Sequence, residues 1–179
     1  MERDSLKTIV EGLLFAGSEP LGVDALAEVI PAADRKTVQS VVDELESEFR
    51  ERSGGFFLAR IGGGYQFRTS PSIAPWILEM KKSKPARLSR AALETLSIVA
   101  YNQPVTRAEI EQIRGVESSA TVKGLVEREL IEIVGRKEIA GRPILYGTTP
   151  RFLEVFGLAD LASLPVLPER EAEPKPDSP

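Results

Sequence analysis

The feature that most constrains the fold is a repeated order of helical and β-prone patterns. Two short helical patterns are followed by a third and then by two β-prone runs, and this order occurs twice. Pro20 and Pro104 lie 84 positions apart, and the same offset superimposes the apolar helical positions of the two copies. Such a fixed interval predicts two copies of one small domain. The offset pairs Leu21 with Val105, Leu26 with Ile110, Val29 with Ile113, Val38 with Val122, Val41 with Leu125 and Val42 with Val126.

The first copy contains three amphipathic patterns and a hairpin signal. Apolar residues at helical spacing predict helices that end at Gly17 and at Pro31, and a longer helix between Val38 and Phe49. The run GGFFLARIGGGYQFRTSP predicts two strands that are joined through glycines 62–64. A further apolar pattern predicts a closing helix, and the charged, proline-containing run KKSKPAR predicts a hinge.

The second copy carries clear helix boundaries. Ser89 is a predicted N-cap, and TRAE is a capping box in which Thr106 and Glu109 satisfy each other's backbone amides. Gly115 ends that second helix. After the third helix, LIEIV and PILYGTT predict two strands, and a short final helix follows.

The two copies differ in length beyond the third helix. Pro71 and Pro150 lie 79 positions apart instead of 84, so the second copy is five residues shorter there. We expect the hairpin to absorb this difference. The predicted fold class is mainly α with small β-hairpins (α+β), arranged as two tandem winged-helix domains.

Composition excludes most catalytic chemistry. The 179 residues include no histidine and no cysteine, which removes the usual zinc ligands, Cys and His nucleophiles and the commonest general base. Neighbouring acids such as Glu109 and Glu111 point in different directions on a helix. We therefore expect no enzyme, no cofactor, no metal and no small-molecule substrate. The first residues lack the pattern of a signal peptide or a membrane span, so we expect a cytoplasmic protein.

The charge balance disfavours nucleic acid as the main ligand. The sequence has 23 basic and 27 acidic residues, a net charge of −4. The third helix of each copy, which would enter the major groove, carries acids or small residues where Arg, Asn or Gln would read bases. Arg136, Lys137 and Arg142 in the second hairpin keep one alternative open, a winged-helix DNA-binding transcription regulator.

The stretch GRKEIAGRPILYGTT, residues 135–149, is predicted to be the wing of the second copy. Its glycines are turn and bulge residues, and Gly141 with Pro143 is expected to set the entry into the second strand. Tyr146 shares a strand face with Ile144. Arg142 is better placed to pair with a carboxylate, such as Glu138, than with phosphate. The aromatic residues Trp76, Tyr101, Phe152 and Phe156 are expected to pack in the core or between helices.

Several runs together resemble the bacterial segregation and condensation protein B (ScpB) family. The dense part covers residues 88–165 and includes LSRAALETLSIVAYNQPVTRAEIEQIRGV, ERELI, GRKEIAGRPILYGTT, FLEVFGL and LASLP. The first half is similar more loosely, in EGLLFAGSEPL and GGGYQFRTSPSIAPW. One departure is Glu129, where the family usually has glycine.

The resemblance implies a non-enzymatic adaptor subunit of the SMC–ScpA–ScpB condensin-like complex. Such a subunit forms homodimers, binds the kleisin ScpA, reaches the SMC ATPase through ScpA, and supports chromosome condensation and segregation during cell division. It implies a cytoplasmic, nucleoid-associated protein that contacts DNA only indirectly or weakly and does not bind membranes.

These inferences give a domain map and two sets of residues. We expect an N-terminal winged-helix domain over 1–80 that dimerises, a linker over 81–87, a C-terminal winged-helix domain over 88–164 and a disordered, acidic, proline-rich tail over 165–179. The candidate partner-binding or wing residues are Arg136, Lys137, Arg142, Tyr146, Phe152 and Phe156. The structural signature comprises Thr106, Glu109, Gly115, Gly135, Gly141, Pro143 and Gly147.

Overall fold

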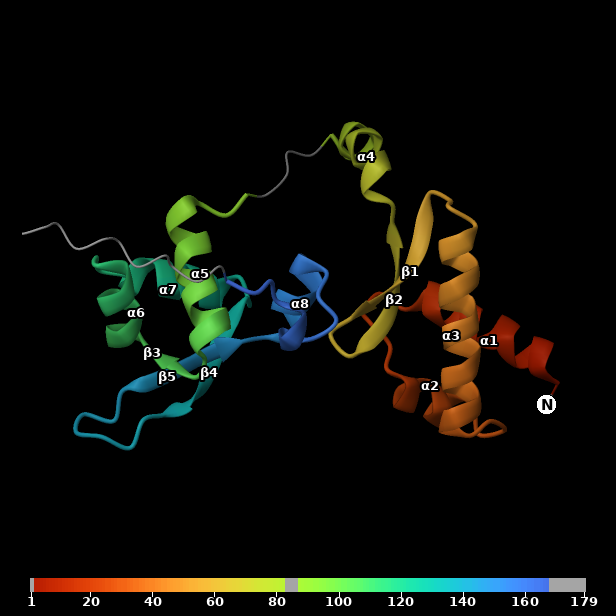
Figure 1. The fold of residues 1–179 in the computed structure, drawn as a ribbon, viewed down its shortest axis with the longest axis horizontal. Coiled ribbons are helices and arrows are strands. Elements are labelled where there is room, and N and C mark those ends of the chain that lie inside the picture. The colour runs from red at the N-terminus through yellow and green to blue at the C-terminus, as the bar shows by residue number, and fades with distance from the viewer. Residues whose placement is uncertain (1, 83–86, 168–179) are drawn as a thin grey trace, which may run out of the picture.

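The chain folds into two units, each with three helices followed by an antiparallel hairpin (Figure 1). The computed structural model describes residues 2–82 and 87–167, so the predicted hinge lies partly, and the predicted disorder of the tail almost entirely, outside the described residues. The predicted α+β class and winged-helix order are confirmed. The first unit contains α1 (Arg3–Ala16), α2 (Val23–Val29), α3 (Arg35–Glu51), β1 (Phe56–Ile61) and β2 (Gly64–Thr69), followed by η1 (Pro71–Ile73) and α4 (Ala74–Lys81). The second contains α5 (Arg90–Asn102), β3 (Val105–Thr106), α6 (Arg107–Arg114), α7 (Ser119–Glu127), β4 (Ile131–Arg136), β5 (Ile144–Thr148), α8 (Pro150–Phe156) and η2 (Leu161–Ser163).

The first unit is built around the apolar stripe of α3. Asp34 caps this helix by accepting a hydrogen bond from the Thr37 amide at 2.7 Å. The stripe packs against α1, α2 and the inner face of the hairpin, which together form one core. The fully buried residues of this core include Leu14, Leu26, Val38, Val41, Val42 and Leu45.

The first hairpin turns through two glycines and pairs with a third segment. Gly62 and Gly63 have φ angles of 58° and 78°, the left-handed region that a tight two-residue turn requires. On the other side of β2, Leu21 and Tyr65 exchange two backbone hydrogen bonds of 2.9 Å. The backbone of Leu21 therefore lies directly against Gly64.

In the second unit the sheet has three strands in the order β3-β5-β4. The register between β4 and β5 shifts between Ile133 and Gly135, which marks a β-bulge. The prediction that the hairpin alone absorbs the length difference was wrong. The third helix shortens from 17 residues in α3 to 9 in α7, while the wing loop lengthens, with residues 137–143 in place of Gly62 and Gly63.

The expectation that Trp76 packs in the core or between helices was also wrong. Its side chain is 70% exposed, and α4 buries none of its residues. Figure 1 shows the cause, because α4 projects away from the other described helices of both units. By contrast, Phe152 is buried in the core of the second unit, while Tyr101 and Phe156 are partly exposed at its surface.

The tip of the first hairpin contacts the segment that follows α8 (Figure 1). The amide of Gly62 donates to the carbonyl of Leu158 at 3.0 Å, and that of Gly63 to the carbonyl of Ala159 at 2.9 Å. Arg68 adds a bond from its guanidinium to the Glu154 carbonyl at 3.1 Å. The two units are thus joined by main-chain hydrogen bonds as well as by the chain between them.

Glu129, at the position where glycine was expected, adopts a left-handed conformation with φ of 58°. It follows α7, and the backbone bonds from Glu129 to Val126 and from Leu130 to Leu125 close the helix end. We predict that Glu129→Gly raises the free energy of unfolding by about 1 kcal/mol, because glycine adopts this conformation without steric cost. Urea unfolding measures the change. Glu127→Gly, within α7, is the control and should lower it by about 0.5–1 kcal/mol; a destabilised Glu129→Gly variant would contradict the prediction.

Candidate protein-binding site

The candidate residues from the sequence fall into two separate places. Arg136, Arg142 and Tyr146 line a hollow of about 310 Å³ between the wing and the start of α6. Phe152 and Phe156 line a different hollow of about 280 Å³ between α5 and α8. The structure therefore does not bring the six residues together into one site.

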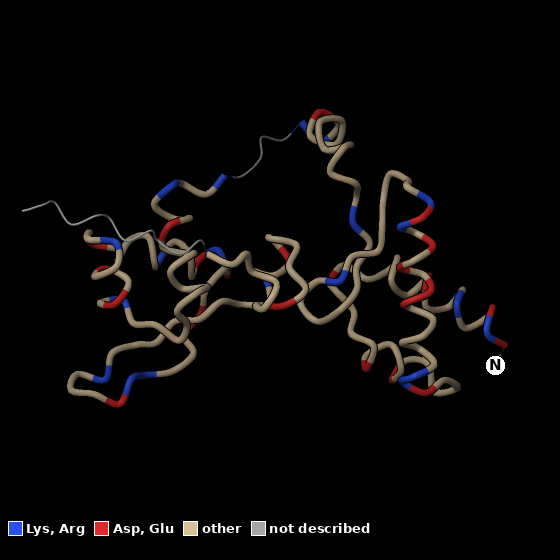
Figure 2. The backbone as a smooth tube through the Cα atoms, viewed as in Figure 1, with Lys and Arg blue, Asp and Glu red and all other residues tan. Residues whose placement is uncertain are grey.

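The basic side chains of the wing are largely neutralised within the chain. Lys137 forms an ion pair with Glu109, and Arg142 forms one with Glu138 at 2.7 Å. The Arg136 guanidinium donates to the carbonyl of Arg142 at 3.2 Å. Figure 2 shows the same alternation, with an acidic segment between basic ones on the wing. Two of the three wing cations therefore have a carboxylate partner within the chain, while Arg136 bonds to a backbone carbonyl instead.

Glu109 links the wing to the start of α6. The predicted capping box is present: the Thr106 hydroxyl accepts from the Glu109 amide at 3.3 Å, and Glu109 accepts from the Thr106 amide at 2.8 Å. The same carboxylate binds the Lys137 ammonium. The hydrogen bond from Lys137, followed by those from Thr106, lowers the pKa of Glu109 from its usual 4.5 to about 2.

We predict a pH-dependent contribution of Glu109 to stability. Because its pKa is lowered on folding, the contribution is complete above pH 4.5 and is lost as the pH falls from there towards about 2. Glu109→Gln keeps the capping geometry but removes the charge, so it should cost about 0.5 kcal/mol at pH 7 for this half-exposed pair. The difference in melting temperature between the two proteins should shrink at pH 3. Glu138→Gln is the control on an exposed pair; a pH-independent gap for Glu109→Gln would refute the assignment.

The glycines of the signature have distinct structural roles. Gly115 ends α6 and Gly141 lies in the wing loop, with φ angles of 72° and 83°. Gly135 follows the β-bulge, and a Cβ atom added there would have nothing within 4 Å. At Gly147 a Cβ atom would lie 2.9 Å from Val134 and 3.0 Å from Gln103. Pro143 contributes its carbonyl, which accepts from the Lys137 amide at 2.9 Å. Gly115 thus ends a helix, whereas the other four residues lie in the wing.

The hollow between α5 and α8 is apolar and aromatic. The rings of Phe152 and Phe156 lie 5.0 Å apart, with Phe152 in the core and Phe156 43% exposed. The Tyr101 hydroxyl donates to the carbonyl of Pro165 at 2.6 Å, which holds the segment after η2 against the rim. Such a hollow can take apolar side chains from another protein. Its remaining wall residues are Leu93, Leu96, Ser97, Ala100, Leu158 and Leu164.

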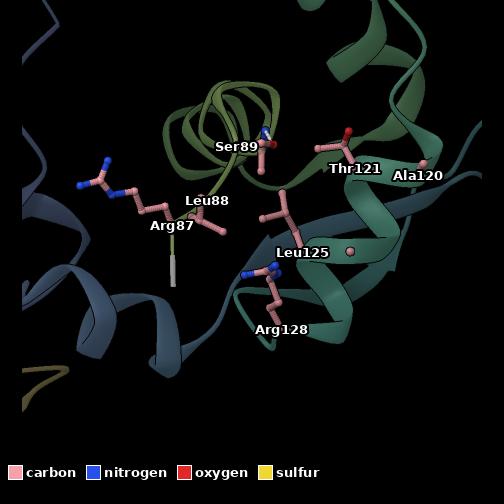
Figure 3. Close-up of a pocket in the computed structure, with 9 residues that line it drawn as sticks. Arg87, Leu88, Ser89, Ala120, Thr121, Leu125 and Arg128 are labelled. Carbon is pink, nitrogen blue, oxygen red and sulfur yellow. Dashed lines mark hydrogen bonds between the residues drawn. The ribbon is translucent and has the colours of Figure 1, made fainter. Parts of the chain in front are cut away.

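A third hollow, of about 370 Å³, lies between the start of α5 and the exposed face of α7 (Figure 3). Leu88 and Leu125 face each other across it, and the Arg87 guanidinium points away. Ala120 and Gly124 have small side chains or none, which leaves space over the surface of α7. The small residues of α7 are visible in the sequence, but the hollow depends on the packing of α5 against α7 and could not be predicted from them.

Two further classes of site receive no support from the described ranges. Within residues 2–82 and 87–167, no group of three or more potential ligands is arranged to hold a metal ion. In the same ranges, no helix is both long enough and apolar enough to cross a membrane.

Comparison with known proteins gives consistent matches. A family model described as segregation and condensation complex subunit ScpB matches residues 8–167. Segregation and condensation protein B of Syntrophotalea carbinolica is 48% identical over 169 residues, covering 94% of this chain and 85% of that protein. The protein of the same name from Desulforamulus reducens is 45% identical over 167 residues, covering 93% and 92%. A crystal structure of a dimer of the ScpB N-terminal domain complexed with ScpA peptide is 31% identical, with a TM-score of 0.40, and covers 43% of this chain and 95% of that one.

Proposed function

The chain belongs to the family of the segregation and condensation complex subunit ScpB, and from this premise we propose that it is a non-enzymatic adaptor that binds the kleisin ScpA. In this proposal it acts as a homodimer, reaches the SMC ATPase through ScpA, and supports chromosome condensation and segregation at the nucleoid. The observation that carries the proposal is the half-exposed aromatic hollow of the second unit, together with a separate wing in which Lys137 and Arg142 are already paired with carboxylates.

We propose that this hollow receives a kleisin segment. An amphipathic helix can lay its apolar side chains against Phe156 and Tyr101, while Phe152 forms the floor. The first unit, residues 1–80, is proposed to dimerise. Its surface includes Phe15 and Val29, which are 78% and 64% exposed and are compatible with burial in an interface.

Co-purification with ScpA and light scattering test the adaptor function. We expect a dimer that retains ScpA through size-exclusion chromatography. A strictly monomeric protein that ignores ScpA at micromolar concentrations would rule the adaptor function out.

The alternative is a DNA-binding transcription regulator, which the charge distribution disfavours. Glu44 on α3 forms ion pairs with Arg3 and Lys7 of α1, both at 2.8 Å, so these two basic residues already have a carboxylate partner. The outer side of α7 combines the small residues Ala120 and Gly124 with Lys123, which faces Glu127 at 3.8 Å. A gel-shift experiment at low and moderate salt distinguishes the two functions, because phosphate contacts give an affinity that falls steeply with salt.

A further inference from the structure

The outer edge of β1 presents unpaired backbone groups. In a hairpin with a two-residue turn, the residues that flank the turn, here Ile61 and Gly64, form a hydrogen-bonded pair. Bonding then alternates, so the amides and carbonyls of Phe56, Leu58 and Arg60 point away from β2. The bonds between Tyr65 and Leu21 support this alternation. Tyr65 lies opposite Arg60, and its amide and carbonyl bond to Leu21, on the side of β2 that faces away from β1.

No described segment covers this edge. In residues 2–82 and 87–167, no backbone or side-chain group outside the hairpin bonds to the outward groups of Phe56, Leu58 or Arg60. The edge carries little of the usual protection against strand pairing, since FFLARI contains no proline, no register shift and only one charged residue, Arg60 near its end. The corresponding strand of the second unit, β4, is interrupted by its bulge.

A hollow of about 570 Å³ runs along the same edge. Its walls are β1 itself, the last turns of α3 and the turn that joins them. The partly exposed ring of Phe56 contributes an aromatic surface, and the buried Phe49 lies behind it with ring centroids 5.4 Å apart. An occupant can therefore form backbone hydrogen bonds with β1 and place a side chain against Phe56.

The charges at the two ends of β1 indicate what the occupant carries. The Arg52 guanidinium lies 5.3 Å from the ring centroid of Phe56, at the start of the strand. Arg60 is near its end, roughly 14 Å further along at strand spacing. In the described ranges neither side chain has a carboxylate within 4.0 Å. The pKa of Asp160 is lowered first by the hydrogen bonds from Ser163 and then, at longer range, by the charge of Arg60. By contrast, Arg50 is already paired with Glu46 at 2.8 Å.

We propose that the β1 edge binds an extended segment of another protein as an added strand, with apolar residues at alternate positions and acidic residues near both ends. Because the last turns of α3 wall the hollow on one side, a single strand fits beside β1 more readily than the folded hairpin of a second copy. This site is on the first unit, so it is distinct from the ScpA-binding hollow proposed above and does not depend on it.

The test uses the full chain and a synthetic peptide of alternating valine and threonine with two glutamates at each end. Hydrogen exchange is followed by NMR. The amides of Phe56, Leu58 and Arg60 should become at least tenfold more protected on peptide binding, whereas those of Phe57 and Ala59, which bond to β2, should change little. A matched peptide with lysines in place of the glutamates should bind at least threefold more weakly.

Two variants isolate the backbone contribution. Arg60→Pro removes an outward amide without removing a bond to β2, and should weaken peptide binding at least tenfold. Arg60→Ala keeps that amide and should weaken it by threefold or less. If Arg60→Pro fails to fold, the comparison of the two peptides on the unchanged protein decides. The proposal is overturned if the outward amides stay unprotected at millimolar peptide, if both peptides bind equally, or if protection rises with protein concentration alone, which would identify a second copy as the occupant. None of these results bears on co-purification with ScpA.

Discussion

Replacing Gly64 with alanine should lower the free energy of unfolding by about 2–3 kcal/mol, the cost of forcing atoms into a packed site. A Cβ atom at this position would lie 2.9 Å from the carbonyl carbon of Leu21 and 3.0 Å from its oxygen. The obstacle is backbone, and it is fixed by the two hydrogen bonds between Leu21 and Tyr65. Relief of the clash must therefore break the pairing that anchors the segment after α1 to the sheet.

Gly12→Ala is the matched control for this prediction. Gly12 lies within α1, and nothing is within 4 Å of a Cβ atom added there. The same chemical change should therefore stabilise the protein by about 0.5–1 kcal/mol, since alanine favours the helix. Urea unfolding followed by circular dichroism measures both. Equal effects of the two variants would show that the contact at Gly64 relaxes without cost.

Phe156→Asp should reduce the affinity for ScpA at least tenfold, provided that ScpA binds the hollow between α5 and α8. The substitution places a charge beside the ring of Phe152 and removes an exposed aromatic surface, the kind of side chain that dominates binding energy at interfaces. Because Phe156 is 43% exposed, the fold should tolerate the change. Isothermal titration calorimetry with purified ScpA gives the affinity, and thermal melting verifies the fold.

Val155→Asp is the control for position. Val155 is on the same helix and is 51% exposed, but it does not line the hollow. It should leave the affinity for ScpA within threefold of the unchanged protein. Equal losses in both variants would place the effect elsewhere on α8, and no loss in Phe156→Asp would exclude this hollow as the ScpA site.

Local sequence patterns predicted the elements of the fold well. The stripe from Val38 to Phe49 and the capping box of Thr106 and Glu109 are set by residues within a few positions of each other, so the sequence alone reveals them. The replacement of the family's usual glycine by Glu129 also points to a local feature, a helix end with positive φ, which the structure has at this residue.

Features that depend on distant segments were missed. Helical spacing in α4 predicted burial of Trp76, but burial requires a partner surface, and no described element supplies one. The sequence placed Arg136, Lys137 and Arg142 together on the wing, yet it could not show that Lys137 reaches Glu109 on α6. The separation of the wing from the aromatic hollow likewise depends on how α5 and α8 pack.

The contact between the two units, made by the bonds from Gly62 and Gly63 to Leu158 and Ala159, should tolerate substitutions of the side chains around it. They involve main-chain atoms alone, so substitutions of the Leu158 or Ala159 side chain leave the donors and acceptors in place. Because one polypeptide carries both partners, their effective concentration reaches the millimolar range even if the tether is flexible. A contact too weak to hold two separate proteins together can therefore persist here. The relative orientation of the two units can then be retained while the residues around the contact diverge.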